Sequence, residues 1–531
     1  MTKGVRAADA RVGGVGVTGD RDLFVGLDLG TSSLKAVAVG AGGEIAARAH
    51  ASYPTQRPEP GAAEQSPADW WAAVESVVAA LRGGGAPAER WAAIGLSGMI
   101  PTLVLTDDEG EPVAPAMTWE DGRAEAEGEA LRARLGGERL YALTGQWVDG
   151  RYLLPMHLRL ARVAPPAARR ARRLLGAKDW LFWRLTGEPA TDPSTATGFG
   201  CYGLETGAWL DEAVDAWGAE LAKHTRATEP GDVGSITPPS LPPVLASTAS
   251  RPLTAAAAAR LGLPAGLPVC LGGADSVVGC LGLGVSRPGD VACVAGTSTV
   301  LLGVAERLVI DPGHRYLITP LAGLDGWGFE MDLLTTGSAF HWLAGLLGAA
   351  GGDEAALMAM AAGVEPGAAG LSFLPYLAPG EQGALWDPEL SGALLGLSLG
   401  HGAAEVARAL VDGVVLEMRR CLAVLDDVGL PRGPLRVAGG SAVDSTFRRQ
   451  LADACRREVG YAADGETAHS AIGAAALAAA ATGRRLPAAA PSALETVGPS
   501  EAESARWDAL WRRHEVALAA VRASRAADAR P

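Results

Sequence analysis

A strand, a Gly-Thr-Ser turn and a second strand occur together twice in this chain, and this repeated unit constrains the fold more than any other feature. The first copy reads FVGLDLGTSSLKAVAVG over residues 24–40, and the second reads VACVAGTSTVLLGVA over residues 291–305. The residues after each turn are rich in valine and alternate in side, which favours a strand over the helix that follows a P-loop. Because the two copies lie about half the chain apart, we infer an internal duplication.

The segments that follow the two copies agree in type. The predicted elements are a strand at 43–53, a helix at 66–82 and a strand at 92–98 after the first copy, and a strand at 326–334 and a helix at 335–347 after the second. Ser66, Pro67 and Asp69 supply a cap oxygen, a proline for the first turn and an early acid, which together mark a helix start. This order predicts two related α/β domains with a cleft between them.

Each Gly-Thr-Ser turn is suited to bind phosphate, because successive backbone N–H groups and hydroxyls around a turn form a site for an anion. The turn residues are Gly30, Thr31, Ser32 and Ser33 in the first copy and Gly296, Thr297 and Ser298 in the second. Two such turns facing one cleft would hold the two ends of a polyphosphate. An ordinary hairpin with a polar tip explains the first turn equally well when that turn is taken alone.

Two carboxylates stand at positions that suit catalysis. Asp28 immediately precedes the first turn, where a carboxylate would repel phosphate oxygens unless Mg²⁺ lay between them. Asp275 ends an apolar strand after two glycines, where the backbone can approach a ligand closely and the carboxylate can take a proton from a hydroxyl. The alternative role of Asp275 is a cap for the helix that follows, and the two roles are compatible.

A third glycine-containing loop follows the strand-like segment LRVA and precedes a predicted helix. Its residues are Gly439, Gly440, Ser441 and Ala442. Small residues at this point leave space for a flat ring and its sugar, which favours an adenosine site. A simple strand-to-helix loop is the competing interpretation.

Lysine is rare in this arginine-rich chain, and coding bias explains the imbalance. The rarity still makes two lysines worth locating. Lys35 follows the first turn, and we favour a structural role in which it points to solvent or to a partner carboxylate over a contact with nucleotide. The other is Lys178, in the segment AKDWLFWRL.

Composition excludes several classes of function. The net charge of −14 and the pI near 5.2 provide no electrostatic footprint for nucleic acid or an anionic membrane. The six cysteines contain no C-x-x-C pair, which argues against a zinc site or a disulfide framework and favours the cytoplasm.

The apolar run at 471–481 is shorter than the roughly 20 residues of a spanning helix, so we expect a tightly packed core helix there. Residues 1–21 lack the apolar stretch of a secretory signal and are expected to form a disordered tail.

The motifs occur in an order that resembles the FGGY carbohydrate kinases, which share a superfamily with actin and heat-shock chaperones, and the xylulokinase branch above all. The segments that carry the resemblance are, in chain order, DLGTSSLKA, PEPGAAEQSPADWW, GLSGMIPTLVLTDDEGEPVAPAMTWEDGRA, AKDWLFWRLTGEPATDPSTAT, GGADSVVGCLGLG, AGTST, SGALLGLSLGHGAAEVARALVDGV and AGGSAVDSTFRRQLAD. Each segment alone is weakly specific, whereas all of them in family order are strongly specific.

The resemblance implies an α/β fold with two ribonuclease-H-like domains, of the actin and sugar-kinase type, and a central cleft for nucleotide and sugar. It implies an N-terminal domain at 22–271 for sugar and phosphate contacts, a C-terminal domain at 272–520 for ATP, and a tail at 521–531. Closure of the two domains would exclude water from the reaction. The Ala- and Gly-rich faces are compatible with a homodimer.

The implied activity is phosphorylation of a sugar hydroxyl with ATP and Mg²⁺, and the implied partner is a small sugar or polyol. By matching position, Asp275 is the general base, Asp28 helps to hold Mg²⁺, and the two turns and the 439–442 loop contact ATP. The implied substrate contacts are Met99, Ile100, Pro101, Trp119, Glu120, Asp121, Asp275 and Ser276.

Several departures from the family pattern fall in the part that selects the sugar. Pro101 stands where xylulokinases carry a histidine that hydrogen-bonds the sugar, and it has no side-chain donor. Other differences are Ser276 for asparagine, Ala62 for tryptophan, Met156 for lysine and Glu120 for asparagine or glutamine. These differences argue against xylulose as the substrate more than they argue against kinase chemistry. The resemblance as a whole still implies a kinase for a ketopentose, with D-xylulose favoured. The main alternative is a kinase for ribulose, gluconate, glycerol or another polyol, and a nucleotide-driven binding protein is less favoured.

Overall fold

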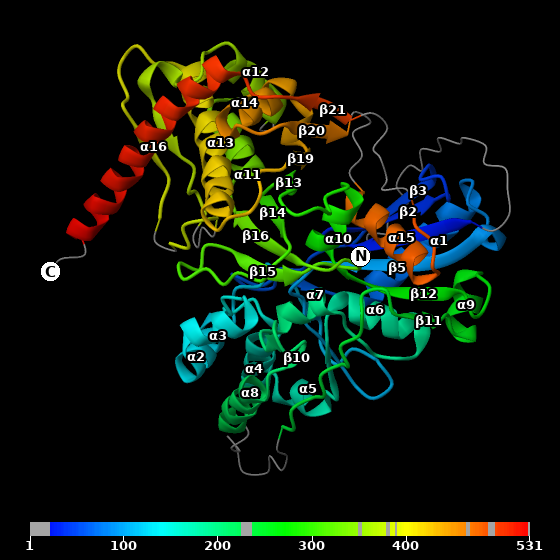
Figure 1. Cartoon of the computed structure of the whole chain (residues 1–531). Coiled ribbons are helices and arrows are strands. Elements are labelled where there is room, and N and C mark those ends of the chain that lie inside the picture. The colour runs from blue at the N-terminus through cyan, green and yellow to red at the C-terminus, as the bar shows by residue number, and fades with distance from the viewer. Residues whose placement is uncertain are drawn as a thin grey trace. The chain divides into compact units, whose positions relative to one another are not determined.

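The computed structural model of the protein describes residues 22–224, 236–348, 353–378, 383–387, 390–462, 468–486 and 494–528, and the chain forms two compact units (Figure 1). Unit 1 comprises Met1–Gly284, Ile318–Gly326 and Ala468–Ala490, and unit 2 comprises Val285–Leu317, Trp327–Thr467 and Pro491–Pro531. The predicted tail at 1–21 lies outside the described residues. The predicted domain boundary at 271 stays a prediction.

A six-stranded sheet with the order β11-β12-β5-β1-β2-β3 forms the centre of unit 1. Its strands are β1 (Leu23–Leu29), β2 (Ser33–Val39), β3 (Ile45–Ser52), β5 (Trp91–Gly98), β11 (Ser250–Pro252) and β12 (Pro268–Ala274). β1 pairs antiparallel with β2 across the first Gly-Thr-Ser turn and parallel with β5, which pairs parallel with β12. Every residue of β1 is buried, as expected for a central strand with an almost uninterrupted apolar sequence.

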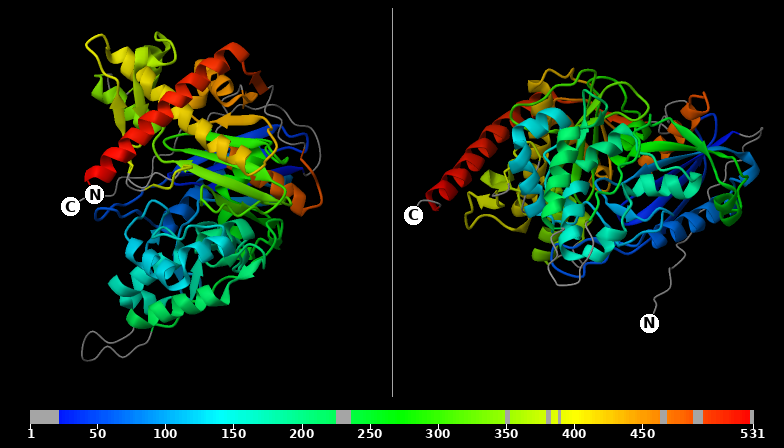
Figure 2. Two further views of the ribbon diagram at one scale, coloured as in Figure 1. Left: turned by 60° about the vertical axis from the view of Figure 1, so that its left-hand side comes forward. Right: turned by 90° about the horizontal axis from the view of Figure 1, so that it is seen from below.

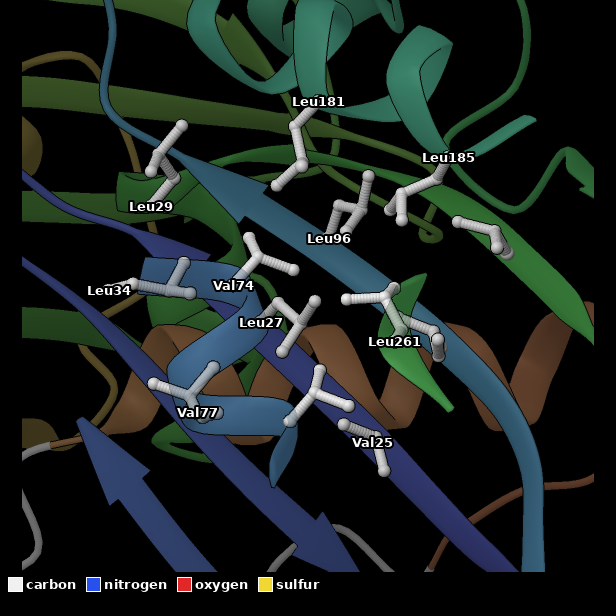
Figure 3. Packing of buried hydrophobic residues seen from close by; sticks show 14 of the residues in the cluster. Val25, Leu27, Leu29, Leu34, Val74, Val77, Leu96, Leu181, Leu185 and Leu261 are labelled. Carbon is white, nitrogen blue, oxygen red and sulfur yellow. The ribbon is translucent and has the colours of Figure 1, made fainter. Parts of the chain in front are cut away.

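One face of this sheet packs against three helices, α1 (Pro67–Gly83), α6 (Ala177–Thr186) and α9 (Ala255–Leu261). Figure 3 shows valine and leucine side chains of the strands and these helices meeting in one core. Helix α1 begins at the predicted place, with Ser66 as its N-cap residue and Pro67 in its first turn. However, the Ser66 side chain makes no capping hydrogen bond, so the predicted cap oxygen is wrong.

The alanine-rich helix α15 (His469–Ala481) packs against β1, β5 and α10 (Asp275–Gly282) of the same unit. A Cβ on Gly26 would lie 1.7 Å from the carbonyl oxygen of Ala471, and one on Gly95 would lie 1.9 Å from that of Ala474. Side chains alternate across a strand, so this contact lies on the face opposite to the α1 core. The predicted core helix is confirmed, and it touches the sheet backbone to backbone because only glycine fits between them.

The remaining part of unit 1 is built around a second core that includes Leu105, Leu158, Phe199 and Trp217. Its elements are β4 (Glu64–Gln65), β6 (Val104–Thr106), β7 (Ala116–Met117), β8 (Arg173–Leu175), β9 (Tyr202–Gly203), β10 (Ala208–Trp209), α2 (Glu125–Leu135), α3 (Gly137–Thr144), α4 (Leu153–Val163), α5 (Pro165–Arg170), α7 (Pro193–Ala196) and α8 (Asp211–His224). The short strand β15 (Leu317–Pro320) lies largely in the 318–326 segment of this unit.

Unit 2 has a central sheet in which its strands follow the order β16-β14-β13-β19-β20-β21. They are β13 (Val291–Ala295), β14 (Thr299–Ala305), β16 (Trp327–Leu333), β19 (Leu435–Ala438), β20 (Val459–Ala462) and β21 (Leu494–Val497). β13 pairs antiparallel with β14 across the second turn and parallel with β19. This is the pattern of β1, β2 and β5, and both predicted strand-turn-strand units are confirmed.

The α-helices among the described residues of unit 2 are α11 (Gly337–Leu346), α12 (Glu354–Ala362), α13 (Ala403–Asp427), α14 (Ser445–Cys455) and α16 (Glu501–Asp528). A small hairpin is formed by β17 (Ser372–Leu374) and β18 (Ala393–Leu395). Helix α11 confirms the predicted helix after the third strand. Helix α16 is one continuous helix in both views of Figure 2. It extends beyond residue 520, where the tail was predicted to begin.

Candidate active site

Neighbouring parallel strands of unit 1 end at one edge of the sheet, and this edge gathers the two predicted catalytic carboxylates. Asp28 of β1 pairs in register with Ser97 of β5, and Gly273 of β12 pairs with the same serine. Asp275 follows as the first residue of α10, whose N-cap residue is Ala274. The interpretation of Asp275 as the helix cap is therefore wrong, whereas its place at the end of a strand is confirmed.

The Asp28 carboxylate is almost completely buried, and its polar neighbours include Ser97 and Lys35. The hydroxyl of Ser97 donates a hydrogen bond to Asp28 Oδ1 at 2.9 Å. Burial raises the pKa of Asp28 above its usual value, while the Ser97 hydrogen bond and the charge of Lys35 act in the opposite direction. Lys35 lies directly opposite Asp28 in the β1–β2 pair, which agrees with the structural role that we favoured for this lysine.

The first Gly-Thr-Ser turn is held through its carbonyl groups. The hydroxyl of Tyr53 donates to the carbonyl of Gly30, and the Tyr53 N–H donates to the carbonyl of Ser32 at 3.2 Å. The side-chain amide of Gln65 donates to the carbonyl of Thr31 at 2.6 Å. Within the described part of the chain, no acceptor engages the N–H of Thr31 or Ser32. These two N–H groups are therefore available to an anion, as the turn chemistry predicts.

The Thr31 hydroxyl is oriented by Trp119. The indole Nε1–H of Trp119 donates to Thr31 Oγ1 at 3.0 Å. An indole can only donate, so the hydroxyl acts as the acceptor in this bond and keeps its own proton for another partner. Thr31 can thus donate to a phosphate oxygen beside the two free N–H groups.

Tyr53 lies close to both predicted catalytic carboxylates, Asp28 and Asp275. Burial raises the pKa of the Tyr53 phenol far above its usual value, and the charges of Asp28 and Asp275 raise it further. Asp275 and Ser276 are only partly buried, so a ligand can reach them. Neither Tyr53 nor Ser97 nor Gln65 was predicted as a site residue. Each reaches Asp28 or the first turn from another strand or loop.

Three predicted substrate contacts follow β5. Met99 is buried in the core of unit 1, and its N–H donates to the carbonyl of Leu29 at 3.0 Å. Ile100 and Pro101 are partly exposed. The Met99 side chain therefore packs in the core, and the next two residues offer the accessible surface at this strand end.

The segment from Trp119 to Arg123 is fixed by ion pairs. Asp121 has no exposed side-chain surface, accepts the N–H of Ala63 at 3.0 Å and pairs with Arg123 at 2.6 Å. Glu120 pairs with Arg57 at 2.8 Å. These contacts give Asp121 a structural role, and its predicted contact with substrate, like that of Glu120, stays a prediction.

In unit 2, the second Gly-Thr-Ser turn is held by the start of helix α11. The N–H of Gly337 donates to the carbonyl of Gly296 at 3.1 Å, and the N–H groups of Thr336 and Ser338 donate to that of Thr297 at 3.3 and 3.0 Å. A Cβ on Gly337 would lie only 2.4 Å from Gly296 O. The turn and the helix therefore meet backbone to backbone, a contact that sequence reasoning missed.

The predicted adenosine loop lies beside the second turn. β19 runs parallel to β13 with Ala438 opposite Val294, so Gly439 follows next to the end of β13. Gly439 has a φ of 94°, and a Cβ on it would lie 2.3 Å from the carbonyl oxygen of Ala295. Gly440 has open space around it. The strand-loop-helix prediction is confirmed, and the adenosine role of Gly439 to Ala442 stays a prediction.

The donor groups fit a Mg²⁺ ion that is held mainly by phosphate and water. Within the described ranges, no three histidine, cysteine, aspartate or glutamate side chains form a cluster that could hold a metal. Mg²⁺ is commonly bound by one or two carboxylates together with substrate phosphates. Asp28 supplies one carboxylate next to the first turn, and Ser97 engages only its Oδ1 atom.

A pocket of about 560 Å³ in unit 1 contains none of the predicted site residues. Its walls include the start of α1, Trp71, Trp180 and Arg184. Gln65 also lines this pocket and donates to the carbonyl of Thr31. Gln65 thus connects the wall of this pocket with the first turn.

All six cysteines are free thiols. In the part of the chain that the structure describes, no helix is both long enough and apolar enough to cross a membrane.

Comparison with known proteins links this arrangement to one family. The N-terminal domain of the FGGY family of carbohydrate kinases matches residues 23–282, and the C-terminal domain matches residues 291–482. A xylulose kinase from Escherichia coli (strain K12) is 30% identical over 431 residues, which cover 81% of this chain and 84% of the relative. A glycerol kinase from Thermus brockianus is 32% identical over 453 residues, which cover 81% of this chain and 84% of that relative.

The crystal structure of xylulose kinase from Rhodospirillum rubrum superimposes on this chain with a TM-score of 0.84 at 30% identity. The match covers 94% of this chain and 99% of that structure. The predicted α/β fold with two sugar-kinase-type domains is therefore confirmed.

Proposed function

This chain belongs to the FGGY family of carbohydrate kinases, and from that premise we propose that it transfers the γ-phosphate of ATP to a hydroxyl group of a ketopentose, with D-xylulose favoured. The observation that supports the proposal most strongly is the grouping of residues at one edge of the unit 1 sheet. There, Asp28, Asp275 and the first Gly-Thr-Ser turn follow the ends of neighbouring strands.

The chemistry of each group suits phosphoryl transfer, which depends on positioning and on stabilisation of negative charge. The partly exposed Asp275 carboxylate accepts the proton of the sugar hydroxyl as that oxygen bonds to the γ-phosphorus. The bond from the γ-phosphorus to the β,γ-bridging oxygen breaks at the same time, and ADP leaves. The free N–H groups of the first turn and the Thr31 hydroxyl bind phosphate oxygens and hold the phosphate chain in place. Asp28 would help to hold Mg²⁺, which would supply neutralisation of the phosphate charge when bound.

Unit 2 provides the second set of contacts to ATP in this proposal. The turn at Gly296 to Ser298 binds phosphate oxygens, and the loop from Gly439 to Ala442 receives adenosine. We place the activity in the cytoplasm, where ATP is available and where six free thiols remain reduced.

The substrate is the finer part of the proposal. The E. coli and R. rubrum relatives named as xylulose kinases support a ketopentose. The glycerol kinase of similar identity, together with Pro101 in place of a hydrogen-bonding histidine, favours a second candidate, phosphorylation of another polyol or sugar acid.

The test is ADP release by the purified protein with Mg-ATP and a panel of D-xylulose, L-xylulose, D-ribulose, gluconate, glycerol and several aldoses. We expect the highest kcat/KM with D-xylulose. A higher kcat/KM with another compound of the panel would change the proposed substrate, while the proposed kinase activity would stand. Absence of stimulation by every compound, in a protein that binds ATP, would contradict the proposed function.

A further inference from the structure

Lys178 is completely buried between two carboxylates. Its Nζ lies 2.9 Å from Asp179 Oδ1 and 3.3 Å from Asp192 Oδ1, and none of the three side chains has exposed surface. Burying three charges is costly, and a well-packed apolar cluster is often as stable. This cluster therefore needs an explanation beyond stability.

The cluster lies directly behind the end of β5. A Cβ on Gly98, the last residue of β5, would lie 2.9 Å from the Cβ of Lys178. Gly98 pairs in register with Ala274, the residue before Asp275. The buried lysine is thus one strand away from the backbone that carries the proposed base.

A continuous chain of hydrogen bonds links the cluster to that backbone. Asp192 Oδ2 accepts the hydroxyl of Ser194 at 2.5 Å, and Ser194 Oγ accepts the N–H of Ala274 at 2.9 Å. A carboxylate can only accept, so the Ser194 proton points to Asp192 and the serine lone pair points to Ala274. The Lys178 ammonium lies 3.3 Å from the other oxygen of the same carboxylate, Asp192 Oδ1, so Asp192 joins the buried lysine to Ser194.

The Ala274 N–H takes this unusual partner because β12 is interrupted just before it. The β5–β12 register shifts between Cys270 and Gly273. Gly272 has a φ of 72°, and a Cβ on it would lie 1.6 Å from the carbonyl oxygen of Leu96. Such bulges change the direction of a strand and often occur next to active sites. After the bulge, the Ser194 hydroxyl fixes the strand end.

We propose that Lys178, Asp192 and Ser194 are positioning residues that fix the backbone at Ala274 and thereby aim the Asp275 carboxylate at the substrate hydroxyl. This inference rests on the proposed role of Asp275 as the general base. It assigns a role to Lys178, which contacts neither the turn nor Asp275 through any described hydrogen bond.

The test compares Ser194→Ala with a matched control, Ser247→Ala. Both serines donate to Asp192 Oδ2, Ser194 at 2.5 Å and Ser247 at 3.1 Å, and both are buried. Of the two serine side chains, only that of Ser194 also accepts a hydrogen bond from the N–H of Ala274. We expect the two variants to lose similar thermal stability. We expect Ser194→Ala to lower kcat about tenfold, the scale of a small misplacement of a reacting group, with KM for ATP within about twofold. Ser247→Ala should keep kcat within about twofold.

A second measurement does not depend on activity. Hydrogen–deuterium exchange of peptides that span residues 270–276 should become faster in Ser194→Ala and remain as in the wild type in Ser247→Ala. Equal kcat in the wild type and Ser194→Ala would overturn the inference, and so would unchanged exchange at 270–276.

The same experiments separate this inference from the proposed function. If no sugar stimulates the wild type, the proposed function fails while the exchange data still report on the link to Ala274. If the wild type is active and Asp275→Asn is inactive, but Ser194→Ala is fully active, only the positioning inference fails.

Discussion

Replacement of Gly337 by alanine tests whether the second Gly-Thr-Ser turn depends on its contact with helix α11. The added Cβ would lie 2.4 Å from Gly296 O, whereas ordinary contacts begin at 3.4 Å. The turn or the start of the helix must therefore move by about 1 Å. Such a movement stretches the bonds from Gly337 to Gly296 and from Ser338 to Thr297.

The size of the effect follows from this overlap. Overpacking of a rigid contact costs about 1–3 kcal/mol, and both partners here are backbone. If about 2 kcal/mol of this cost falls on the turn in its phosphate-binding conformation, the affinity for ATP decreases about 30-fold. Any part of the strain that is already present in the free protein lowers the free energy of unfolding instead of the affinity, so the two losses together should total about 1–3 kcal/mol.

The assay is isothermal titration of Mg-ATP, combined with thermal unfolding. Gly345→Ala on the same helix is the matched control, because no atom lies within 4 Å of the added Cβ. We expect unchanged affinity for ATP in Gly345→Ala and a gain in helix stability of up to about 1 kcal/mol. Wild-type affinity and stability in Gly337→Ala would show that the close backbone contact does not hold the turn, and would refute the reasoning.

Three further predictions concern the two carboxylates and the predicted adenosine loop. Asp275→Asn should lower kcat by about a thousandfold, the scale of a lost general base, with the Kd for ATP nearly unchanged, and near-normal turnover would contradict the base assignment. For Asp28, burial raises the pKa of the carboxyl, so the native state binds this proton more tightly than the unfolded state and stability decreases as pH rises above the usual value of 3.8. Asp28→Asn should therefore increase the free energy of unfolding at pH 7 by about 1 kcal/mol while lowering Mg-ATP-dependent activity. The gain in stability should disappear below about pH 4, where the carboxyl is protonated in both states. A gain that does not change with pH would refute this account. Gly439→Ala should lower the free energy of unfolding by about 2 kcal/mol or more, because the site has a φ of 94° and the added Cβ would lie 2.3 Å from Ala295 O. The control is Gly440→Ala, which has open space around its Cβ and should change stability by less than about 0.5 kcal/mol.

The local parts of the site were predictable because they depend on short stretches of chain. Alternating valines and a Gly-Thr-Ser turn are sufficient to predict the hairpins of β1 with β2 and of β13 with β14. The placement of Asp28 and Asp275 at strand ends follows in the same way from apolar runs that stop at a carboxylate. The cap at Ser66 was wrong because a cap depends on the orientation of one side chain, which composition does not determine.

Other parts of the site depend on contacts between distant segments. Trp119 reaches Thr31, and Tyr53 reaches Gly30, only because separate strands and loops are folded around the first turn. Helix α15 lies on the sheet of unit 1 although it follows most of unit 2 in the sequence. No periodicity in the alanine-rich segment indicates that it would pack against Gly26 and Gly95.

The amino-acid sequence by itself therefore determined the two strand-turn-strand units, the two candidate catalytic carboxylates and the resemblance to a kinase family. Each of these features depends on a short continuous segment of the chain. Only the tertiary structure decided how those residues are held. It placed Lys178 between Asp179 and Asp192, linked Ser194 to Ala274 and set α11 against the second turn. Hydrogen bonds and close backbone contacts of this kind depend on packing in three dimensions, where distance along the chain carries little information.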